Sequence, residues 1–268
     1  MKYKDKIAIV TGASFGIGKA IALLLAEQGC HVVCTARSTS KIEEVASIIR
    51  AKSRKAIAIT TDVSNKVSVK EMVDKVFKEF GKIDILINNA GGPMAGISYP
   101  TPKESNDFFD VMDKLTFINI SDKDWDSIFN INFYGMLNSV RYVLPIMMKQ
   151  DSGDIINISS KAGKTKADVV PGMIAYASAK GALTRFTEVL AFELMCAGSK
   201  VRINSVSPGM VATSFHENLP PDQLEGYRKP DEIKDILFKV LDNTDNVSGE
   251  TLSAETFKTW AEELKEGI

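Results

Sequence analysis

The stretch Thr11–Gly18 reads T-G-A-S-F-G-I-G, and it joins a short apolar run to a helical pattern. This strand–turn–helix setting is the one that a dinucleotide-binding glycine turn requires. Gly12 would permit the sharp turn, Gly16 would let the backbone approach a pyrophosphate, and Gly18 would let the helix pack closely on the strand. We therefore predict a dinucleotide cofactor, bound here by Gly12, Ser14, Phe15, Gly16, Ile17 and Gly18.

Short β-rich apolar runs alternate with longer helical patterns along the rest of the chain, which predicts βαβ units and a parallel sheet. We expect strands at Lys6–Val10, His31–Ala36, Ala56–Thr60, Ile83–Asn88, Asp154–Ser159 and Val201–Val206, and helices at Ile17–Gln28, Lys41–Ala51, Val67–Phe80, Asp122–Met148 and Tyr176–Cys196. Gly29 and Gly81 would end two of these helices. The fold expected for residues 1–268 is α/β: one doubly wound Rossmann domain with a parallel sheet of about seven strands and helices on both faces.

The composition narrows the classes of function. The chain of 268 residues has 33 basic and 34 acidic residues and no basic block, which argues against nucleic acid and favours a small-molecule partner. Three cysteines without C-x-x-C spacing and two histidines without a ligand cluster indicate no disulfide framework, no metal site and no Ser-His-Asp triad. No apolar run approaches the length of a membrane span, so we expect a cytoplasmic protein.

The end of the second expected strand bears on the choice of cofactor. An NAD-binding chain usually places a carboxylate there for the ribose hydroxyls, but this chain has Thr35-Ala36-Arg37-Ser38. Arg37, with Ser38, could instead hold a 2′-phosphate, which predicts NADP(H) in preference to NAD(H). The alternative is an arginine that simply faces solvent. After the third strand, Asp62 and Val63 lie where an adenine ring would rest against the sheet.

Two fragments share the pattern Y-x-x-x-K. In Tyr176–Lys180 the residues between are helix formers, so the phenol and the ammonium would lie one turn apart on one face. The positive charge would lower the pKa of the tyrosine toward the neutral range, where it could act as an acid or base. In Tyr99–Lys103, Pro100 and Pro102 forbid a helix, and we interpret this second match as an extended loop.

Upstream of Tyr176, the strand D-I-I-N-I-S-S ends in Ser159-Ser160 at the edge where open α/β sheets bind ligands. Six motifs occur in order along the chain: T-G-A-S-F-G-I-G, N-N-A-G (Asn88–Gly91), Asn132 in I-N-F-Y-G, I-S-S with Ser160, Y-A-S-A-K, and P-G-M-V-A-T (Pro208–Thr213). By these motifs the chain resembles the short-chain dehydrogenase/reductase family from Lys6 to about Gly249. Six ordered motifs on suitable elements are far more specific than any one of them.

The resemblance implies a role for each matched residue. Tyr176 would protonate the carbonyl oxygen as hydride arrives, Lys180 would lower its pKa and bond the nicotinamide ribose, and Ser160 would hold the oxygen. Asn132 would anchor the water chain that resupplies the proton; a helix-interior amide that bonds locally is the alternative. Ser159 is expected to point to the other face. The implied cofactor contacts are Asn89, Ala90, Gly91, Tyr176, Lys180, Pro208, Gly209, Val211 and Thr213, with Asn88 bracing the strands.

Two segments depart from the family pattern. Asn132 follows Gly91 by 41 positions, which is long, and we predict an inserted substrate-side flap at 92–121; a small helix packed on the core is the alternative. Residues 214–268 would form a C-terminal substrate-side segment, with Phe257, Trp260, Ala261 and Leu264 spaced as an amphipathic helix. Family members commonly form dimers or tetramers through the helices that match 122–148 and 176–196, so a homo-oligomer is expected.

The function predicted is that of an NADP-dependent oxidoreductase that interconverts a ketone and a secondary alcohol. A 3-oxoacyl thioester is the first choice of substrate, and a hydroxysteroid or another bulky ketone is the alternative. From another class, a dinucleotide-sensing binding protein would keep the fold without turnover, although such proteins typically lose the tyrosine or lysine that this chain retains. An epimerase or dehydratase would need more chain after Pro208 than is present.

Overall fold

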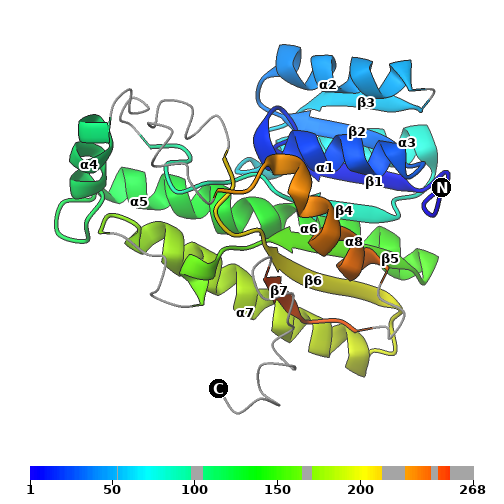
Figure 1. Cartoon of the computed structure of the whole chain (residues 1–268). Coiled ribbons are helices and arrows are strands. Elements are labelled where there is room, and N and C mark those ends of the chain that lie inside the picture. Colours follow the sequence, from blue (N-terminus) through cyan, green and yellow to red (C-terminus); the bar gives the residue numbers. More distant parts are fainter. Residues whose placement is uncertain (53, 98–104, 165–170, 213–226, 243–246, 254–268) are drawn as a thin grey trace.

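The computed structural model describes residues 1–52, 54–97, 105–164, 171–212, 227–242 and 247–253. At its centre is one seven-stranded parallel sheet in the order β3-β2-β1-β4-β5-β6-β7 (Figure 1). The strands are β1 (Ile7–Thr11), β2 (His31–Ala36), β3 (Ala56–Thr60), β4 (Ile85–Asn88), β5 (Gly153–Ile158), β6 (Val201–Ser207) and β7 (Thr251–Ser253). This arrangement confirms the predicted doubly wound α/β class.

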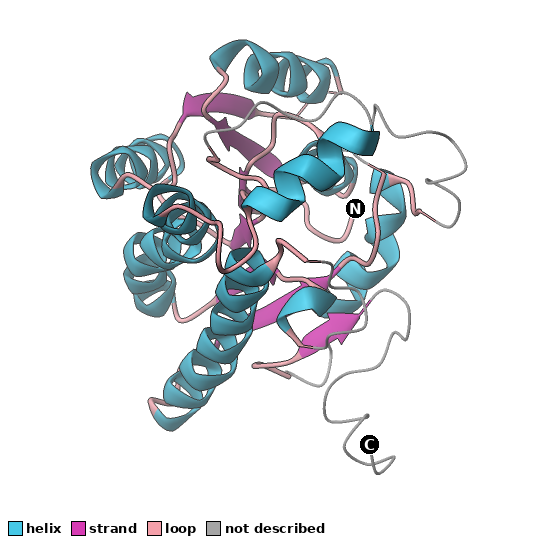
Figure 2. Cartoon of the chain, turned by 90° about the vertical axis from the view of Figure 1, so that its left-hand side faces the viewer, coloured by secondary structure: helices cyan, strands magenta, loops and turns pink. Residues whose placement is uncertain are grey.

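Helices cover both faces of the sheet (Figures 1 and 2). On one face lie α1 (Gly16–Glu27), α2 (Thr39–Ala51) and α8 (Lys234–Leu241); on the other lie α3 (Lys66–Phe80), α6 (Gly135–Gln150) and α7 (Ile174–Cys196). Successive residues of β1 alternate between the two cores, with Ala8 and Val10 on the α1 side and Ile7 and Ile9 on the α3 side. The sheet is therefore buried on both faces, which explains the continuous apolar strands.

The strand order reverses between β1 and β4, and this switch point is where open α/β sheets bind ligands. The glycine turn follows β1, and its backbone is tightly packed. Gly12 has φ +67°, and a Cβ on Gly18 would lie 2.2 Å from the Gly12 carbonyl oxygen and 2.4 Å from Nδ2 of Asn89. The left-handed backbone of Gly12 forms the sharp turn predicted for it, and Gly18 makes the close approach between helix and strand predicted for it.

The helix predicted at Asp122–Met148 is interrupted. The chain forms α5 (Asp122–Phe129), one π-helical turn (Asn130–Tyr134) and then α6. Nδ2 of Asn132 donates to the carbonyl of Ile128 (2.9 Å), four residues earlier, and such side-chain bonds compete with the helical backbone pattern. Single π-helical turns are frequent at functional sites.

The segment from 92 to 121 contains a helix that sequence reasoning offered only as an alternative, α4 (Ser105–Lys114). The predicted loop at Tyr99–Lys103, Thr213 and the predicted amphipathic helix with Phe257 and Trp260 all lie outside the described residues.

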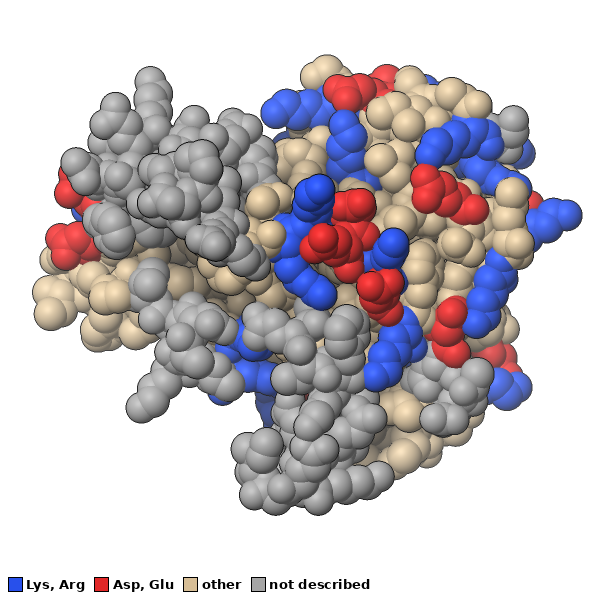
Figure 3. All heavy atoms as spheres, viewed as in Figure 1, with Lys and Arg blue, Asp and Glu red and all other residues tan. Residues whose placement is uncertain are grey.

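The described residues contain neither a candidate membrane span nor a candidate metal site. None of the helices there is long and apolar enough to cross a membrane, and the same ranges hold no group of three or more His, Cys, Asp or Glu side chains that could bind a metal ion. On the face drawn in Figure 3, basic and acidic side chains are interspersed.

Gly18→Ala should lower the stability of the fold by about 3 kcal/mol, the upper end of the usual cost of overpacking, because the added methyl meets backbone that cannot yield easily. Gly81→Ala is the matched control. Its Cβ would meet nothing within 4 Å, so only the left-handed backbone (φ +72°) opposes it, at about 1 kcal/mol. Urea unfolding of both variants measures the difference, and equal losses would contradict the packing argument.

Candidate active site

Hydrogen bonds join the ends of β1 and β4 beneath the glycine turn. Oγ1 of Thr11 donates to the Ile87 carbonyl (3.3 Å) and accepts from the backbone N–H groups of Asn89 (3.0 Å) and Ala90 (3.1 Å). Nδ2 of Asn89 donates to the carbonyls of Thr11 (3.0 Å) and Gly12 (3.2 Å). Asn89 therefore fixes the shape of the turn, a bracing role that sequence reasoning did not assign to it.

The turn fits a dinucleotide phosphate. Gly16 opens α1 with φ +55°, and Phe15 before it caps the helix with no side-chain hydrogen bond. The first turn of α1 carries no acidic residue, so its N–H groups face outward without a competing anion. Ser14 and Ile17 are partly buried in the turn, and Phe15 is 50% exposed.

Two basic side chains lie near the end of β2. Arg37 is exposed, and it makes no hydrogen bond or ion pair with any residue of the described ranges. Ser38 is the N-cap of α2, and its hydroxyl makes no capping bond. Nζ of Lys41, in the first turn of α2, lies 5.7 Å from the ring centroid of Phe15. Sequence reasoning missed Lys41, although its position four residues after Arg37 at a helix start was the available signal.

The carboxylate of Asp62, which follows β3, is hydrogen-bonded to a residue two positions later. It accepts from the backbone N–H (3.0 Å) and the hydroxyl (2.6 Å) of Ser64. Val63 is buried, and its carbonyl accepts from Nδ2 of Asn138 on α6 (3.0 Å). Both residues thus stand at the carboxyl edge of the sheet, held by their neighbours.

The hydroxyls of Ser160 and Tyr176 meet where β5 ends and α7 begins. Ser160 caps a short 3-10 turn, with its Oγ accepting from the N–H of Ala162 (3.2 Å), and its hydroxyl lies near enough to the phenol of Tyr176 to act on the pKa of that group. The neighbouring serine, Ser159, turns the other way and pairs with Oγ1 of Thr184 (2.8 Å). The structure thus brings Ser160, and not Ser159, to the tyrosine.

Lys180 lies one turn of α7 beyond Tyr176. Its Nζ donates to the carbonyl of Ile158 (2.7 Å) and lies 5.7 Å from the centroid of the Tyr176 ring. The side chain is buried, and burial lowers the pKa of the Lys180 amine to about 8 because the charged form loses its hydration.

The pKa of Tyr176 corrects the sequence-based expectation. We expected the lysine to lower it. Instead burial raises the pKa of the phenol, and only the hydrogen bond from Ser160 opposes this. Part of the ring surface stays accessible, yet surrounding protein disfavours phenolate. The amine, itself desolvated and bonded to Ile158, does not offset that effect.

Asn132 is linked to the same group through the segment after β4. Its Nδ2 donates to the Gly92 carbonyl (3.0 Å), and its Oδ1 accepts from the Gly92 N–H (2.8 Å). A Cβ at Gly91 would lie 2.5 Å from Oδ1 of Asn132 and 3.6 Å from Nζ of Lys180. Gly91 therefore separates the amide from the amine with no room for a side chain.

The motif P-G-M-V-A-T after β6 lies within the described residues except for Thr213. Gly209, which follows Pro208, has a left-handed backbone (φ +74°), and Val211 is buried and forms a parallel bridge with Arg228. The structure thus brings Ser160, Tyr176 and Lys180 into one group, connects Asn132 to it, and places the glycine turn at the same edge of the sheet.

Comparison with known proteins identifies the family. Residues 6–224 match the model of the family described as short chain dehydrogenase. The chain belongs to this family. It is 30% identical over 265 residues to the 3-oxoacyl-(acyl-carrier-protein) reductase FabG of Thermotoga maritima, covering 95% of this chain and 98% of that protein. It is 34% identical over 220 residues to the 2,3-dihydro-2,3-dihydroxybenzoate dehydrogenase of Bacillus subtilis, covering 82% of this chain and 75% of that protein.

Among solved structures, a putative short-chain alcohol dehydrogenase from Sinorhizobium meliloti 1021 is similar with a TM-score of 0.77 and 26% identity, over 94% of this chain and 95% of that one. Membership of the short-chain dehydrogenase family makes the protein an oxidoreductase that acts on CH–OH or keto groups with a nicotinamide dinucleotide.

The buried amine of Lys180 should make stability depend on pH. Its pKa is about 8 when folded and 10.5 for the ordinary side chain, so between these values the unfolded chain binds more protons and stability rises with pH. Below pH 8 the whole loss of folding stability from burying the charged amine is present, about 3 kcal/mol at 1.36 kcal/mol per pKa unit. Lys180→Met removes the titrating group. It also removes the hydrogen bond to Ile158, and the effect of that loss on stability does not depend on pH.

The stability of Lys180→Met relative to the parent should therefore be most favourable near pH 7 and decline steadily toward pH 10.5. Urea unfolding across this range measures it. If the stability difference between the variant and the parent stays constant with pH, the pKa of the Lys180 amine is not lowered in the folded parent protein.

Proposed function

We propose that the protein is an NADPH-dependent reductase that converts a ketone to a secondary alcohol, with Ser160, Tyr176 and Lys180 as its catalytic group. The observation that carries this proposal is the meeting of these three side chains at the carboxyl edge of the sheet, next to the glycine turn. Geometry of this kind is the first requirement for an acid catalyst, and a suitable pKa is the second.

Tyr176 is the proton donor in this proposal. Because burial raises its pKa, the phenol stays protonated at neutral pH, which is the form needed to give a proton to a carbonyl oxygen. The hydroxyl of Ser160, which lies beside Tyr176, holds the same oxygen. The nicotinamide ring supplies the hydride when the cofactor is bound.

Lys180 and Asn132 support this pair. The Lys180 amine lies over the Tyr176 ring and also reaches the strand end, where the ribose of a bound cofactor would find a donor. Asn132 holds the Gly91–Gly92 backbone that separates it from Lys180, and its carbonyl oxygen retains a lone pair for a water molecule. We propose that protons return to the phenol of Tyr176 through water held by the carbonyl oxygen of Asn132.

The preference for NADPH rests on the surroundings of Ser38. The end of β2 carries no carboxylate, and the Arg37 guanidinium, the free N-cap hydroxyl of Ser38 and the Lys41 ammonium all stand near the start of α2. These groups suit a 2′-phosphate, since a planar guanidinium can bond two phosphate oxygens at once.

The substrate class proposed is a 3-oxoacyl thioester. It is supported by the named activity of the Thermotoga maritima relative, which matches this chain over 95% of its length. The Bacillus subtilis relative is named for a cyclic diol, so a bulky cyclic ketone is the second candidate.

Oxidation of NADPH should be measured against a 3-oxoacyl thioester, a 3-ketosteroid and an aromatic diketone. Tyr176→Phe should lower kcat by about 100-fold or more, because it deletes the proton donor and leaves the ring in place. Its affinity for NADPH should change little. Turnover that survives in the variant would remove Tyr176 from the chemistry.

If the parent protein binds NADPH tightly but oxidises it with none of these substrates, a dinucleotide-sensing protein is favoured instead. Thioester turnover without ketosteroid turnover would select the first substrate class.

Arg37→Ala should raise the KM for NADPH by about 10- to 100-fold, since a hydrogen bond to a charged group contributes about 1.5–3 kcal/mol. Lys41→Ala should have a smaller effect in the same direction, and neither variant should alter the KM for NADH. Lys70→Ala, an exposed lysine on α3 paired with Asp74, is the control. Equal losses with both cofactors would contradict a 2′-phosphate contact.

A further inference from the structure

A third apolar cluster lies apart from the two cores of the sheet. It joins α4 and the turn after it to α5 and to the first residues of α7. Its buried members are Val111, Met112, Leu115, Ile128 and Ala175, and packed against them are Met94, Ile97, Ile120, Trp125, Met173 and Tyr176. Tyr176 thus rests against apolar side chains that come mainly from the segment between β4 and α5.

The main chains of α4 and the α7 approach are in direct contact. A Cβ at Gly172 would lie 2.1 Å from the carbonyl oxygen of Met112, which also accepts from the N–H of Leu115 (3.1 Å). Gly172 has φ +89°, and α7 begins two residues later at Ile174. The start of α7 is therefore set by backbone packed on backbone, which has little freedom to adjust.

The same segment also holds the other helix of the site. Its first residue, Gly92, makes both of the backbone bonds to the Asn132 amide described above. Further along, a Cβ at Gly96 would lie 2.7 Å from Cδ1 of Ile131, next to Asn132 on the π-helical turn. Thus residues between 92 and 115 contact both the turn that carries Asn132 and the helix that carries Tyr176.

We propose that two described stretches, 92–97 and 111–120, form a clamp that positions Tyr176 against Ser160, and that Met112 and Leu115 are its positioning residues. This inference rests on the proposed role of Tyr176. It separates the two sequence-based alternatives, because a substrate flap would open and close, whereas these two stretches are packed into the site.

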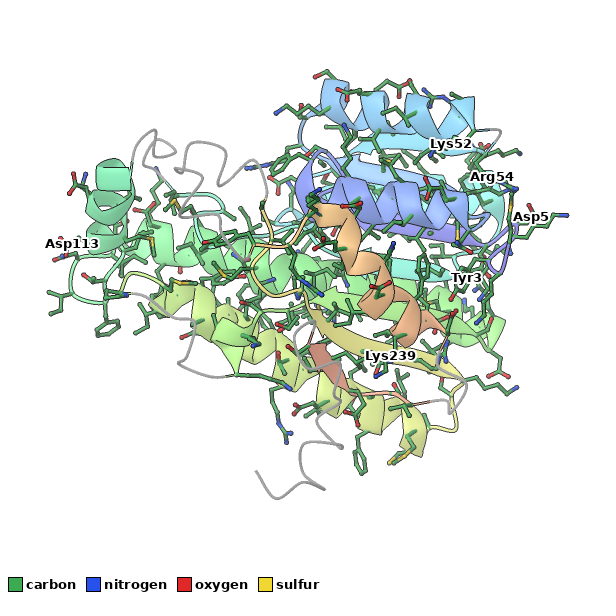
Figure 4. The ribbon with its side chains drawn as sticks, in the orientation of Figure 1. Tyr3, Asp5, Lys52, Arg54, Asp113 and Lys239 are labelled. Atoms are coloured by element: carbon green, nitrogen blue, oxygen red, sulfur yellow. The ribbon has the colours of Figure 1, made fainter. Side chains whose placement is uncertain are left out.

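The clamp stands at the carboxyl edge of the sheet. Figure 4 labels Asp113 on α4 at one end of the molecule and Tyr3 and Asp5 at the opposite end, near the start of β1. Leu115 is fully buried, whereas Phe117 and Ile118 just after it are exposed. Leu115 belongs to neither the core on the α1 side of the sheet nor the core on the α3 side, so its effect should reach the site through Ala175 and Tyr176, which are in its own cluster.

The test compares Leu115 with a leucine at the far end of α7, the helix that carries Tyr176. Leu194 is buried in the α3-side core, 18 residues after Tyr176 and therefore roughly 27 Å along α7 at 1.5 Å per residue. Leu115→Ala and Leu194→Ala each delete a buried side chain at a comparable cost in stability. Leu115→Val and Leu194→Val form a milder pair in case either alanine variant does not fold.

Leu115→Ala should lower kcat by about 10- to 100-fold relative to Leu194→Ala, since displacement of a reacting group by about 1 Å can have such an effect. NADPH affinity should be unchanged, and Leu115→Met, which nearly conserves volume, should restore kcat. If the Leu115 and Leu194 variants lose kcat equally, the clamp is wrong and the cluster only stabilises the fold.

A second readout does not need turnover. The 13C resonance of the Tyr176 ring, assigned by its loss in Tyr176→Phe, should titrate at a different pH in Leu115→Val and at the parent pH in Leu194→Val. Identical titrations in both would overturn the clamp. If the parent reduces no carbonyl in the panel, the proposed function fails while this titration still decides the inference.

Discussion

The position of α7 on the sheet is the constraint on which the rest of the site depends. Three consecutive residues at the carboxyl end of β5 bond to this helix: Asn157 to Thr187 (2.9 Å), Ile158 to Lys180 (2.7 Å) and Ser159 to Thr184 (2.8 Å). All three bonds are buried, so breaking any one would leave a polar group without a partner and would cost more than the bond itself contributes. These bonds hold the helix against the end of β5, which places Ser160, the next residue of the chain, near Tyr176.

The same burial explains the unusual electrostatics of the site. Because α7 lies close against the strand ends, water is largely excluded from Lys180, and its amine loses charge more readily than an exposed lysine. The phenol beside it is held in its neutral form for the same reason. A buried lysine weakens the fold, yet the low polarity of its surroundings strengthens each hydrogen bond made beside it.

The parts of this structure that depend on local sequence were predictable. The glycine turn, six of the seven strands and the helical spacing of Tyr176 and Lys180 each follow from residues within a few positions of one another. The π-helical turn was not predictable, because it involves Asn132 bonded to Gly92, 40 positions earlier. The direction of the Tyr176 pKa shift was wrong because the spacing reveals a neighbouring charge but not how much protein surrounds both groups.

The segment between β4 and α5 shows a further limit of pattern reading. The residues around Val111 and Leu115 are apolar at mixed helical spacing, a pattern that fits a substrate-side flap and a packed helix alike, so it could not say whether these side chains meet ligand or protein. In the fold, the two large cores hold the sheet and the glycine turn, and the third cluster holds the ends of α5 and α7. Since the glycine turn and the ends of α5 and α7 are packed by different sets of side chains, the length of chain between β4 and α5 can change without disturbing the residues that form the glycine turn.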